Sequence, residues 1–452
     1  MKNNLIILFG LPVLLMGNAM QAQFVPQQRE EKKPLTLTEA IELSIKNSHQ
    51  LKSSEAKIEE ATAALKEAVQ KKLPDANVSG SYLRLAAANF DLKIKNNNNG
   101  GGTNTNQTPK VSQAMYGIVN ASLPIFAGGR IRYGIESSEF LEKAAKLDAE
   151  DDKDLVIQTT IEAFAVLFKA KTAVRLVKEN LAQSRQRAKD LSNLEKNGLL
   201  ARNDLLKAEL QSSTIELNLL DAENNLQLAN INMDLMMGLP TATELVLDTT
   251  GIERKDDPRM LDDYMQLAFT NRKDISALDY RTKAAETGVK AVKGEKYPAL
   301  QLTGGYIAAD VPKVFSIVNA LNIGVGVSYN IASIWKNKVK VQQAEARVKQ
   351  LVATKDIADD NLRLQVNKNY FSLLSNRKKI EVYAKALEQA KENNRIIKNK
   401  FDNSLATTTE LLEADVALLQ ATLSYTLAKA DAFVAYNKLL QTVGVLSTEL
   451  KK

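Results

Sequence analysis

The sequence predicts a mainly α-helical fold with a β-strand contribution, in which one structural unit occurs twice. Paired positions reveal the duplication: Pro74 and Pro298 are 224 positions apart, and Gly238 and Gly444 are 206 positions apart. The offset falls by 18 within the first copy, where the Asn- and Gly-rich run 97–102 is the obvious insertion. A unit of about 200 residues is far longer than a solenoid repeat, so we interpret it as a duplicated domain. Proline-free helical patterns and four strand-like segments make up the two copies.

Residues 1–22 carry a positive charge near the start, then an apolar run, then small residues before a plausible cleavage point. This order is typical of a secretory signal peptide, and the run is too short to span a bilayer. A buried N-terminal helix is the alternative. No later stretch of about 18 apolar residues could form a transmembrane helix, and the absence of cysteine excludes disulfides and a lipidated N-terminal cysteine. We therefore expect an exported protein whose membrane attachment comes from its fold.

The first copy, residues 23–238, alternates between helical and strand-like patterns. Its first helix begins with Thr36 or Thr38 as the cap and stops at Pro74, which cannot continue a helix. The later proline-free stretch of some 60 residues corresponds to a rod of roughly 90 Å. The predicted elements are a helix over 35–72, strands over 77–92 and 113–126, a long helix over 131–190, a turn over 197–200 and a helix capped by Asn203 and Asp204.

The second copy, residues 258–452, repeats this order after a linker over 239–257 that contains one strand-like piece. Its strands are joined by a short turn, whereas the first pair is joined by a polar loop over about 94–110 that we expect to be flexible and extracellular. The predicted elements are a helix over 259–296, strands over 300–309 and 321–331, a long helix over 335–398 and a final helix from about 408.

The last helix of each copy has an apolar seam whose spacing alternates between three and four residues. This spacing is the signature of left-handed coiled-coil packing. The first seam comprises Leu205, Ala208, Ser212, Ile215, Leu219, Ala222, Leu226, Ala229, Met233 and Met236. The second comprises Leu411, Ala414, Leu418, Ala421, Tyr425, Ala428, Ala432, Ala435, Leu439 and Thr442. The second seam is richer in alanine, which lets helices approach closely.

Four strands and several very long helices do not make a compact monomer. Rods of this length must bury their seams against one another in a bundle. An open sheet edge is not tolerated in lipid, and four strands cannot close a barrel. If the strands enter a membrane, several chains must therefore pool them, and either eight or twelve strands would satisfy the even count of bacterial barrels. The physical argument requires an oligomer without specifying two or three chains.

Four motifs occur in an order and spacing known from one family. They are LTLTEAI over 35–41, SLPIFAGGR over 122–130, NG…DLL over 197–206 and LAFTNRKDI over 267–275. Together with the duplication they resemble the TolC-type outer membrane efflux proteins, or outer membrane factors, across nearly all of the mature chain. The resemblance implies a homotrimer with a twelve-stranded transmembrane β-barrel and a long antiparallel α-helical coiled-coil tunnel across the periplasm of a Gram-negative bacterium. It also implies export of drugs, toxins or proteins by an inner-membrane RND or ABC pump joined through a periplasmic adaptor.

The resemblance assigns the adaptor-docking tips to two helix–turn–helix connections. An exposed leucine on a tight turn suits an apolar partner surface. An ordinary αα-hairpin turn is the alternative. The residues of the two tips are Gly198, Leu199 and Leu200, and Ser404, Leu405 and Ala406. Ser404 stands where glycine is usual in the family, which leaves the geometry of the second turn open.

Glu410 and Glu413 align with the acidic positions that constrict the closed tunnel entrance in the family. Three chains would place about six carboxylates around one axis, which attracts cations. The alternative is that both are helix N-terminal acids favoured by the helix dipole. At the other end, Phe126 and Trp335 close the second and fourth strands, where an aromatic membrane-interface belt is expected. Packing inside a helical collar is the alternative for these two rings.

Nothing in the sequence supports catalysis or a cofactor. His49 is the only histidine and cysteine is absent, so a zinc site or a nucleophile–histidine pair lacks its parts. The formal charge of +7 comes from lysine and arginine interleaved with acids along helices, and we infer no nucleic-acid partner from it. Two alternatives stay open: an exported coiled-coil scaffold or adhesin without a pore, and the same duct used for protein secretion instead of small-molecule efflux.

Overall fold

The computed structural model describes residues 32–89, 110–248, 257–312 and 314–450. The predicted signal peptide and residues 94–109 of the predicted loop lie outside these ranges. The elements in chain order are β1 (Lys32–Leu35), α1 (Leu37–Asn47), α2 (His49–Gln70), β2 (Asp75–Asn89), β3 (Lys110–Phe126), α3 (Arg130–Lys196), α4 (Arg202–Met237), β4 (Glu244–Leu247), α5 (Leu261–Asn271), α6 (Lys273–Gly294), β5 (Ala299–Val311), β6 (Phe315–Ser328), α7 (Ser333–Asp402), α8 (Thr408–Thr442) and α9 (Leu446–Glu449).

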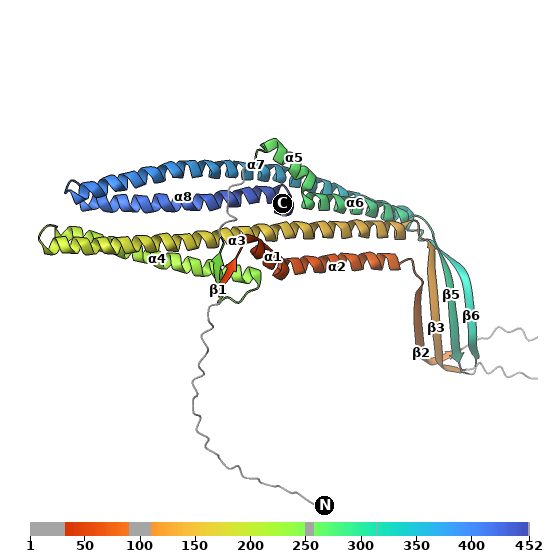
Figure 1. Ribbon diagram of the computed structural model, residues 1–452. Helices are drawn as coiled ribbons and strands as arrows, with labels where there is room; N and C mark the ends of the chain where they lie inside the picture. Colours follow the sequence, from red (N-terminus) through yellow and green to blue (C-terminus); the bar gives the residue numbers. More distant parts are fainter. Residues whose placement is uncertain (1–31, 90–109, 249–256, 313, 451–452) are drawn as a thin grey trace, which may run out of the picture.

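The molecule is elongated, with the four long strands at one end and the α3–α4 and α7–α8 turns at the opposite end (Figure 1). The helices α3 and α7 have 67 and 70 residues, which corresponds to about 100 Å each. The shorter helices α2 and α4 cover successive parts of α3, while α6 and α8 cover successive parts of α7. Contacts of α3 with α6 and α8 join the two copies. Each half is therefore a long helix with two shorter helices packed along it.

The repeated glycines Gly238 and Gly444 each contact an asparagine, Asn47 or Asn271, and these two asparagines are themselves 224 positions apart. The helix α4 ends at Gly238, where a Cβ atom would lie 2.9 Å from the side chain of Asn47. The helix α8 is followed by Gly444, where a Cβ atom would lie 2.7 Å from the Asn271 carbonyl oxygen. Both glycines have positive φ, of 70° and 75°. Only glycine meets both demands at no steric cost, so the duplication preserves a specific close approach.

The predicted single helices over 35–72 and 259–296 are each two helices, which corrects the sequence prediction. The breaks lie at Ser48 (ψ 119°) and Arg272 (ψ 118°), which are themselves 224 positions apart. The Ser48 hydroxyl caps α2 by accepting a hydrogen bond from the Leu51 N–H at 3.2 Å. The Arg272 guanidinium donates to the Thr442 carbonyl at 3.4 Å, which ties the second break to the end of α8. At each break, a capping or tertiary hydrogen bond compensates for the helical hydrogen bonds that are lost.

A small parallel sheet pairs β1 with β4, residue Lys32 opposite Glu244 and Leu35 opposite Leu247. The sequence indicated the second strand but not the first. The helix expected from Leu35 begins at Leu37, and Thr36 is its cap because its hydroxyl accepts from the Glu39 N–H at 3.2 Å. Similarly, α4 begins at Arg202, before its predicted cap.

Both predicted seams are on the packed faces of α4 and α8, where every member is buried or half-buried. Two buried clusters at mid-length hold corresponding residues of the two copies: Leu167 and Met233 in one, Leu373 and Leu439 in the other. Each corresponding pair is 206 positions apart. The coiled-coil interpretation of these helices is therefore confirmed. Among the described residues, no helix combines the length and apolarity that crossing a bilayer requires.

The four long strands form one antiparallel sheet in the order β2–β3–β5–β6. The fourth strand differs from prediction, since it runs over Phe315–Ser328 and not 321–331. Its first residues pair with the end of β5, Phe315 opposite Val311. Asn319 takes a positive φ of 61° at the register shift, which lets the ladder resume.

One buried acid in α4 leads to a pH prediction. Asp234 is fully buried, and burial raises its pKa to about 6, although the Asn230 amide donates to its carboxylate at 2.9 Å. Because the unfolded chain loses this proton at lower pH, stability falls as pH rises from about 4 to 6 and stays lowered above that range. We expect Asp234→Asn to raise the free energy of unfolding by about 2 kcal/mol at neutral pH. Thermal unfolding across this pH range checks it, with the exposed Asp221→Asn as control; an unchanged pH profile would contradict it.

Candidate functional site: a two-faced sheet and two helical tips

The sheet has one apolar and one polar face. Partners in an antiparallel ladder point to the same side, and successive residues point to opposite sides. One row across all four strands joins Val78, Val119, Tyr306 and Leu321. The row one residue away joins Asn77, Asn120, Gly305 and Asn322. This alternation is the pattern of a membrane barrel strand, with lipid on one side and water on the other.

The edge strand β6 shows the alternation most clearly. Its apolar side chains are largely exposed, at 82% for Leu321, 81% for Ile323, 64% for Val325 and 71% for Val327. Between them lie small or polar residues: Asn322, Gly324, Gly326 and Ser328. A soluble protein rarely exposes a contiguous apolar surface of this kind. The face requires an apolar environment.

On the polar face, Gly305 lies between the side-chain amides of Asn120 and Asn322, and there is no room for a side chain at this position. A side chain there would collide with the Val119 carbonyl oxygen, 2.7 Å from the Cβ position. The amide oxygens of Asn120 and Asn322 lie 3.1 and 3.4 Å from the same point. The polar face therefore presents uncharged hydrogen-bonding groups at this level.

The sheet is also open at both sides. Within the described residues, β2 pairs only with β3 and β6 pairs only with β5. Unpaired N–H and C=O groups at such edges cannot be left in hydrocarbon, where each costs several kcal/mol. Of the two predicted interface aromatics, Phe126 is the last residue of β3 and is 50% exposed, whereas Trp335 lies in the first turn of α7, beyond the end of β6, and is 60% exposed. Neither ring is buried in a helical collar within this chain, and their membrane role stays a prediction.

The two tips share one turn geometry. Gly198 and Ser404 both take positive φ, of 72° and 62°. The residue after each donates its N–H back into the preceding helix, Leu199 to Leu194 at 2.9 Å and Leu405 to Lys400 at 2.7 Å. These are Schellman-type ends, so serine does not change the second turn. Leu199 and Leu405 are 74% and 76% exposed, whereas Leu200 and Ala406 are half-buried.

The left-handed serine allows a stability prediction. A non-glycine residue in this region costs roughly 1 kcal/mol. We expect Ser404→Gly to raise the unfolding free energy by about 1 kcal/mol, and Gly198→Ala to lower it by a similar amount, because open space surrounds the Cβ position of Gly198 and only backbone strain changes. Thermal unfolding of the two variants tests this, and a lower melting temperature for Ser404→Gly would refute it.

The two glutamates predicted at the entrance have different surroundings. Glu410 forms a capping box with Thr407: its carboxylate accepts from the Thr407 N–H at 2.6 Å and hydroxyl at 2.9 Å, while the Glu410 N–H donates to that hydroxyl. The Thr407 backbone N–H is the main cause of its lowered pKa. Glu413 is exposed one turn later. Glu410 thus has the structural role that was the alternative reading, and its carboxylate is held in its charged form.

A polar link between the two hairpins was missed from the sequence. Arg187 of α3 pairs with Asp415 of α8, and the Asn394 amide of α7 donates to the same carboxylate at 2.8 Å. Closer to the tips, Phe401 and Leu412 pack against an apolar cluster of the first hairpin. The partners Arg187 and Asp415 are 228 positions apart, so no local pattern indicated them. The link holds the two tips at one relative position.

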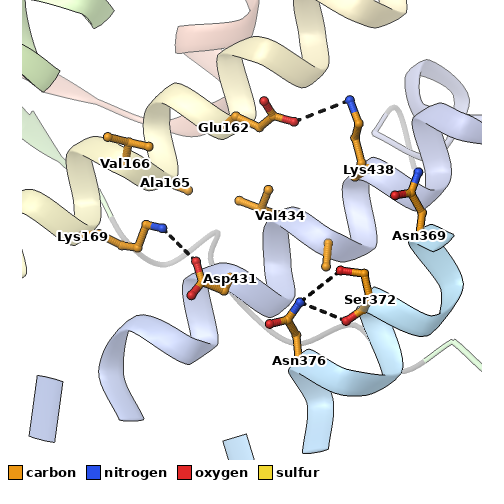
Figure 2. A pocket seen from close by; sticks show the side chains of 11 residues that line it. Glu162, Ala165, Val166, Lys169, Asn369, Ser372, Asn376, Asp431, Val434 and Lys438 are labelled. Carbon is orange, nitrogen blue, oxygen red and sulfur yellow. Dashed lines mark hydrogen bonds and ion pairs between the residues drawn. The ribbon is translucent and has the colours of Figure 1, made fainter. Parts of the chain in front are cut away.

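A cavity of 430 Å³ lies between α3, α7 and α8 at mid-length (Figure 2). Its four charged residues pair across the two copies, Lys169 with Asp431 at 2.8 Å and Glu162 with Lys438 at 3.7 Å. All four charged side chains that line the cavity are therefore engaged in ion pairs. We interpret these pairs as contacts that hold the two halves of the chain together, and not as a ligand site.

Comparison with known proteins identifies the family. The family model described as outer membrane efflux protein matches residues 40–239 and 264–445. Outer membrane efflux protein BepC of Brucella suis biovar 1 (strain 1330) is 22% identical over 456 residues, covering 98% of this chain and 91% of the relative.

Two solved structures have the same fold. The outer membrane protein VceC from Vibrio cholerae has a TM-score of 0.73 at 19% identity, covering 90% of this chain and 96% of that one. The CmeC outer membrane channel of Campylobacter jejuni has a TM-score of 0.73 at 17% identity, covering 92% of this chain and 88% of that one. The resemblance drawn from the motifs is confirmed, as is the mainly helical, duplicated tunnel-and-barrel fold. The chain therefore belongs to the outer membrane efflux protein family, whose members are channel proteins of the outer membrane.

Proposed function

We propose that three copies of this chain pool their strands into a twelve-stranded barrel, continued by a helical tunnel, through which an inner-membrane pump exports its cargo. The observation that carries the proposal is the open sheet with one apolar face. Closure between β2 of one chain and β6 of the next removes both edges at once. Three chains agree with the TolC-type fold, while the physical argument alone also permits two.

In this assembly the row that contains Leu321 faces lipid and the row that contains Asn322 faces the lumen. The lumen side offers amides, hydroxyls and glycine, with few charges along the middle of the strands. Such a wall hydrogen-bonds to water and to varied solutes without a strong preference for either sign of charge. Efflux of small molecules is favoured over protein secretion because the sequence relative is named for efflux.

The tips with exposed Leu199 and Leu405 are the docking point for a periplasmic adaptor, which in turn joins an RND or ABC pump. Each chain presents two exposed leucines on turns of the same geometry, so a trimer would repeat this apolar contact around its axis. The Arg187–Asp415 pair holds the tips closed together, and its release opens the entrance. In this proposal the pump supplies the energy for export.

Reconstitution tests the whole proposal. The protein extracted from outer membranes with detergent is expected to have the mass of a trimer, and to form discrete conducting channels in planar bilayers. A water-soluble monomer without conductance would overturn the proposal and favour the scaffold or adhesin alternative. Co-purification of an adaptor, lost in a Leu199→Ser and Leu405→Ser variant that still conducts, tests the docking role of the tips.

The acidic entrance has its own test. Glutamine at position 410 keeps the capping box, because it accepts the same Thr407 hydrogen bonds, and removes only the charge. We expect the Glu410→Gln and Glu413→Gln double variant to weaken block by divalent cations by about tenfold in single-channel recordings, equivalent to 1.4 kcal/mol. The single variants divide the effect, and we expect Glu413 to carry the larger share. Unchanged block in the double variant would remove both residues from the gate.

A further inference from the structure

A basic cavity of 480 Å³ lies where the sheet joins the helices, at the start of α3 and the end of α6. Three lysines line it, Lys290, Lys293 and Lys296, together with the rings of Phe126 and Tyr297. No carboxylate is among its lining residues. Its volume is within the range of about 300–1,000 Å³ that small-molecule sites occupy.

Two of the three lysines keep their charge available. Lys293 pairs with Glu345 at 2.9 Å. Among the described residues, Lys290 and Lys296 have no carboxylate within 4 Å, and both are exposed. The Lys296 ammonium lies 5.3 Å from the centroid of the Tyr297 ring. The cavity therefore has a net positive charge beside aromatic surface, which suits a ligand with an anionic and an apolar part.

Its position in the sheet identifies which side the cavity faces. Phe126 pairs with Leu300, and Leu300 pairs with Val327 on the apolar face. One wall of the cavity thus continues the surface that meets lipid in the proposed barrel. The adjoining strands β3 and β5 are the inner pair of the sheet, so they are not the edges at which a neighbouring chain would add a strand.

The first copy repeats this site only in part. Lys66 and Lys72 correspond to Lys290 and Lys296, whereas Val69 and Leu73 stand where the second copy has Lys293 and Tyr297. The third lysine and the tyrosine ring are therefore specific to the second copy.

We infer that this cavity binds the phosphate of an anionic glycerophospholipid from the periplasmic leaflet, with the acyl chains along the apolar face. The inference rests on the proposed barrel, because it needs the apolar face in lipid. Ammonium groups at a membrane surface favour anionic headgroups by roughly fivefold per lysine. The aromatic rings pack at the level between headgroup and chain, where they are most favourable. The lipid would strengthen the junction between barrel and helices.

The test uses the purified oligomer in neutral detergent, with phosphatidylglycerol or phosphatidylcholine of identical acyl chains as the probe. Native mass spectrometry counts the retained lipids, and thermal unfolding reports their effect. We expect the wild type to prefer phosphatidylglycerol, and the Lys290→Gln and Lys296→Gln double variant to lose affinity by about 25-fold. The control is Lys391→Gln with Lys398→Gln, which removes two exposed charges from α7 far from the junction.

Equal retention of the two lipids by the wild type, or an undiminished preference in the double variant, would overturn the inference. If the double variant does not fold, salt titration of the wild type decides, since high ionic strength must remove a preference that arises from charge. Conductance in bilayers that contain phosphatidylglycerol separates the two proposals: a conducting channel whose purified oligomer shows no lipid preference overturns only the lipid site, and absence of conductance overturns the channel.

Discussion

Lysine at position 323 is expected to prevent assembly in the membrane, whereas lysine at position 322 is expected to be tolerated. Ile323 and Asn322 are neighbours on β6 that point to opposite faces of the sheet. Ile323 is 81% exposed on the apolar face. A lysine facing lipid near mid-depth costs about 2–4 kcal/mol in a barrel, and a trimer would carry three of them.

The comparison is decisive because both variants add the same charge to the same edge strand. Ile323→Lys should leave little detergent-extractable oligomer in the outer membrane. Asn322→Lys should assemble, and should shift the channel toward anions because the new charges line the lumen. Outer-membrane fractionation and reversal potentials in a salt gradient measure the two effects. Equal assembly of both variants, or failure of Asn322→Lys alone, would show that the faces are assigned wrongly.

Alanine at position 294 is expected to be among the most destabilising substitutions in the helical part. At the end of α6 a Cβ atom on Gly294 would lie 2.4 Å from the Gly128 carbonyl oxygen, and one on Gly128 would lie 2.3 Å from the Gly294 carbonyl oxygen. Both obstacles are backbone atoms, so no rotamer change can relieve the overlap. We expect a loss of about 3 kcal/mol per chain, at the upper end of overpacking effects.

Gly288 supplies a matched control on the same helix. Open space surrounds its Cβ position, so Gly288→Ala should stabilise α6 by roughly 0.5–1 kcal/mol through helix propensity alone. Melting temperatures of the two variants should therefore move in opposite directions. Since Gly128 and Gly294 bring β3 and β5 together where they enter the helices, Gly294→Ala should also weaken the oligomer. A harmless Gly294→Ala would mean that this junction is loosely packed.

The sequence missed several features for identifiable reasons. The helix breaks at Ser48 and Arg272 occur within strongly helical composition, and they depend on contacts with α4 and α8. The capping box of Glu410 has a local signal in the sequence, a threonine followed three residues later by a glutamate. The alternation along β6 was also readable, but the predicted strand began at residue 321 and left out residues 315–320.

The helices and strands of this chain could be predicted because each depends on a pattern within a few turns of helix or a few residues of strand. The duplication, the coiled-coil seams and the existence of four strands follow from spacing alone, since each depends on residues close in sequence or on a constant offset. The pairing of β3 with β5, the Arg187–Asp415 link and the contact between Gly128 and Gly294 join segments more than 100 residues apart. Their register depends on how completed elements pack, and many registers fit the same local pattern. The lysine cavity likewise exists only after two distant chain segments meet.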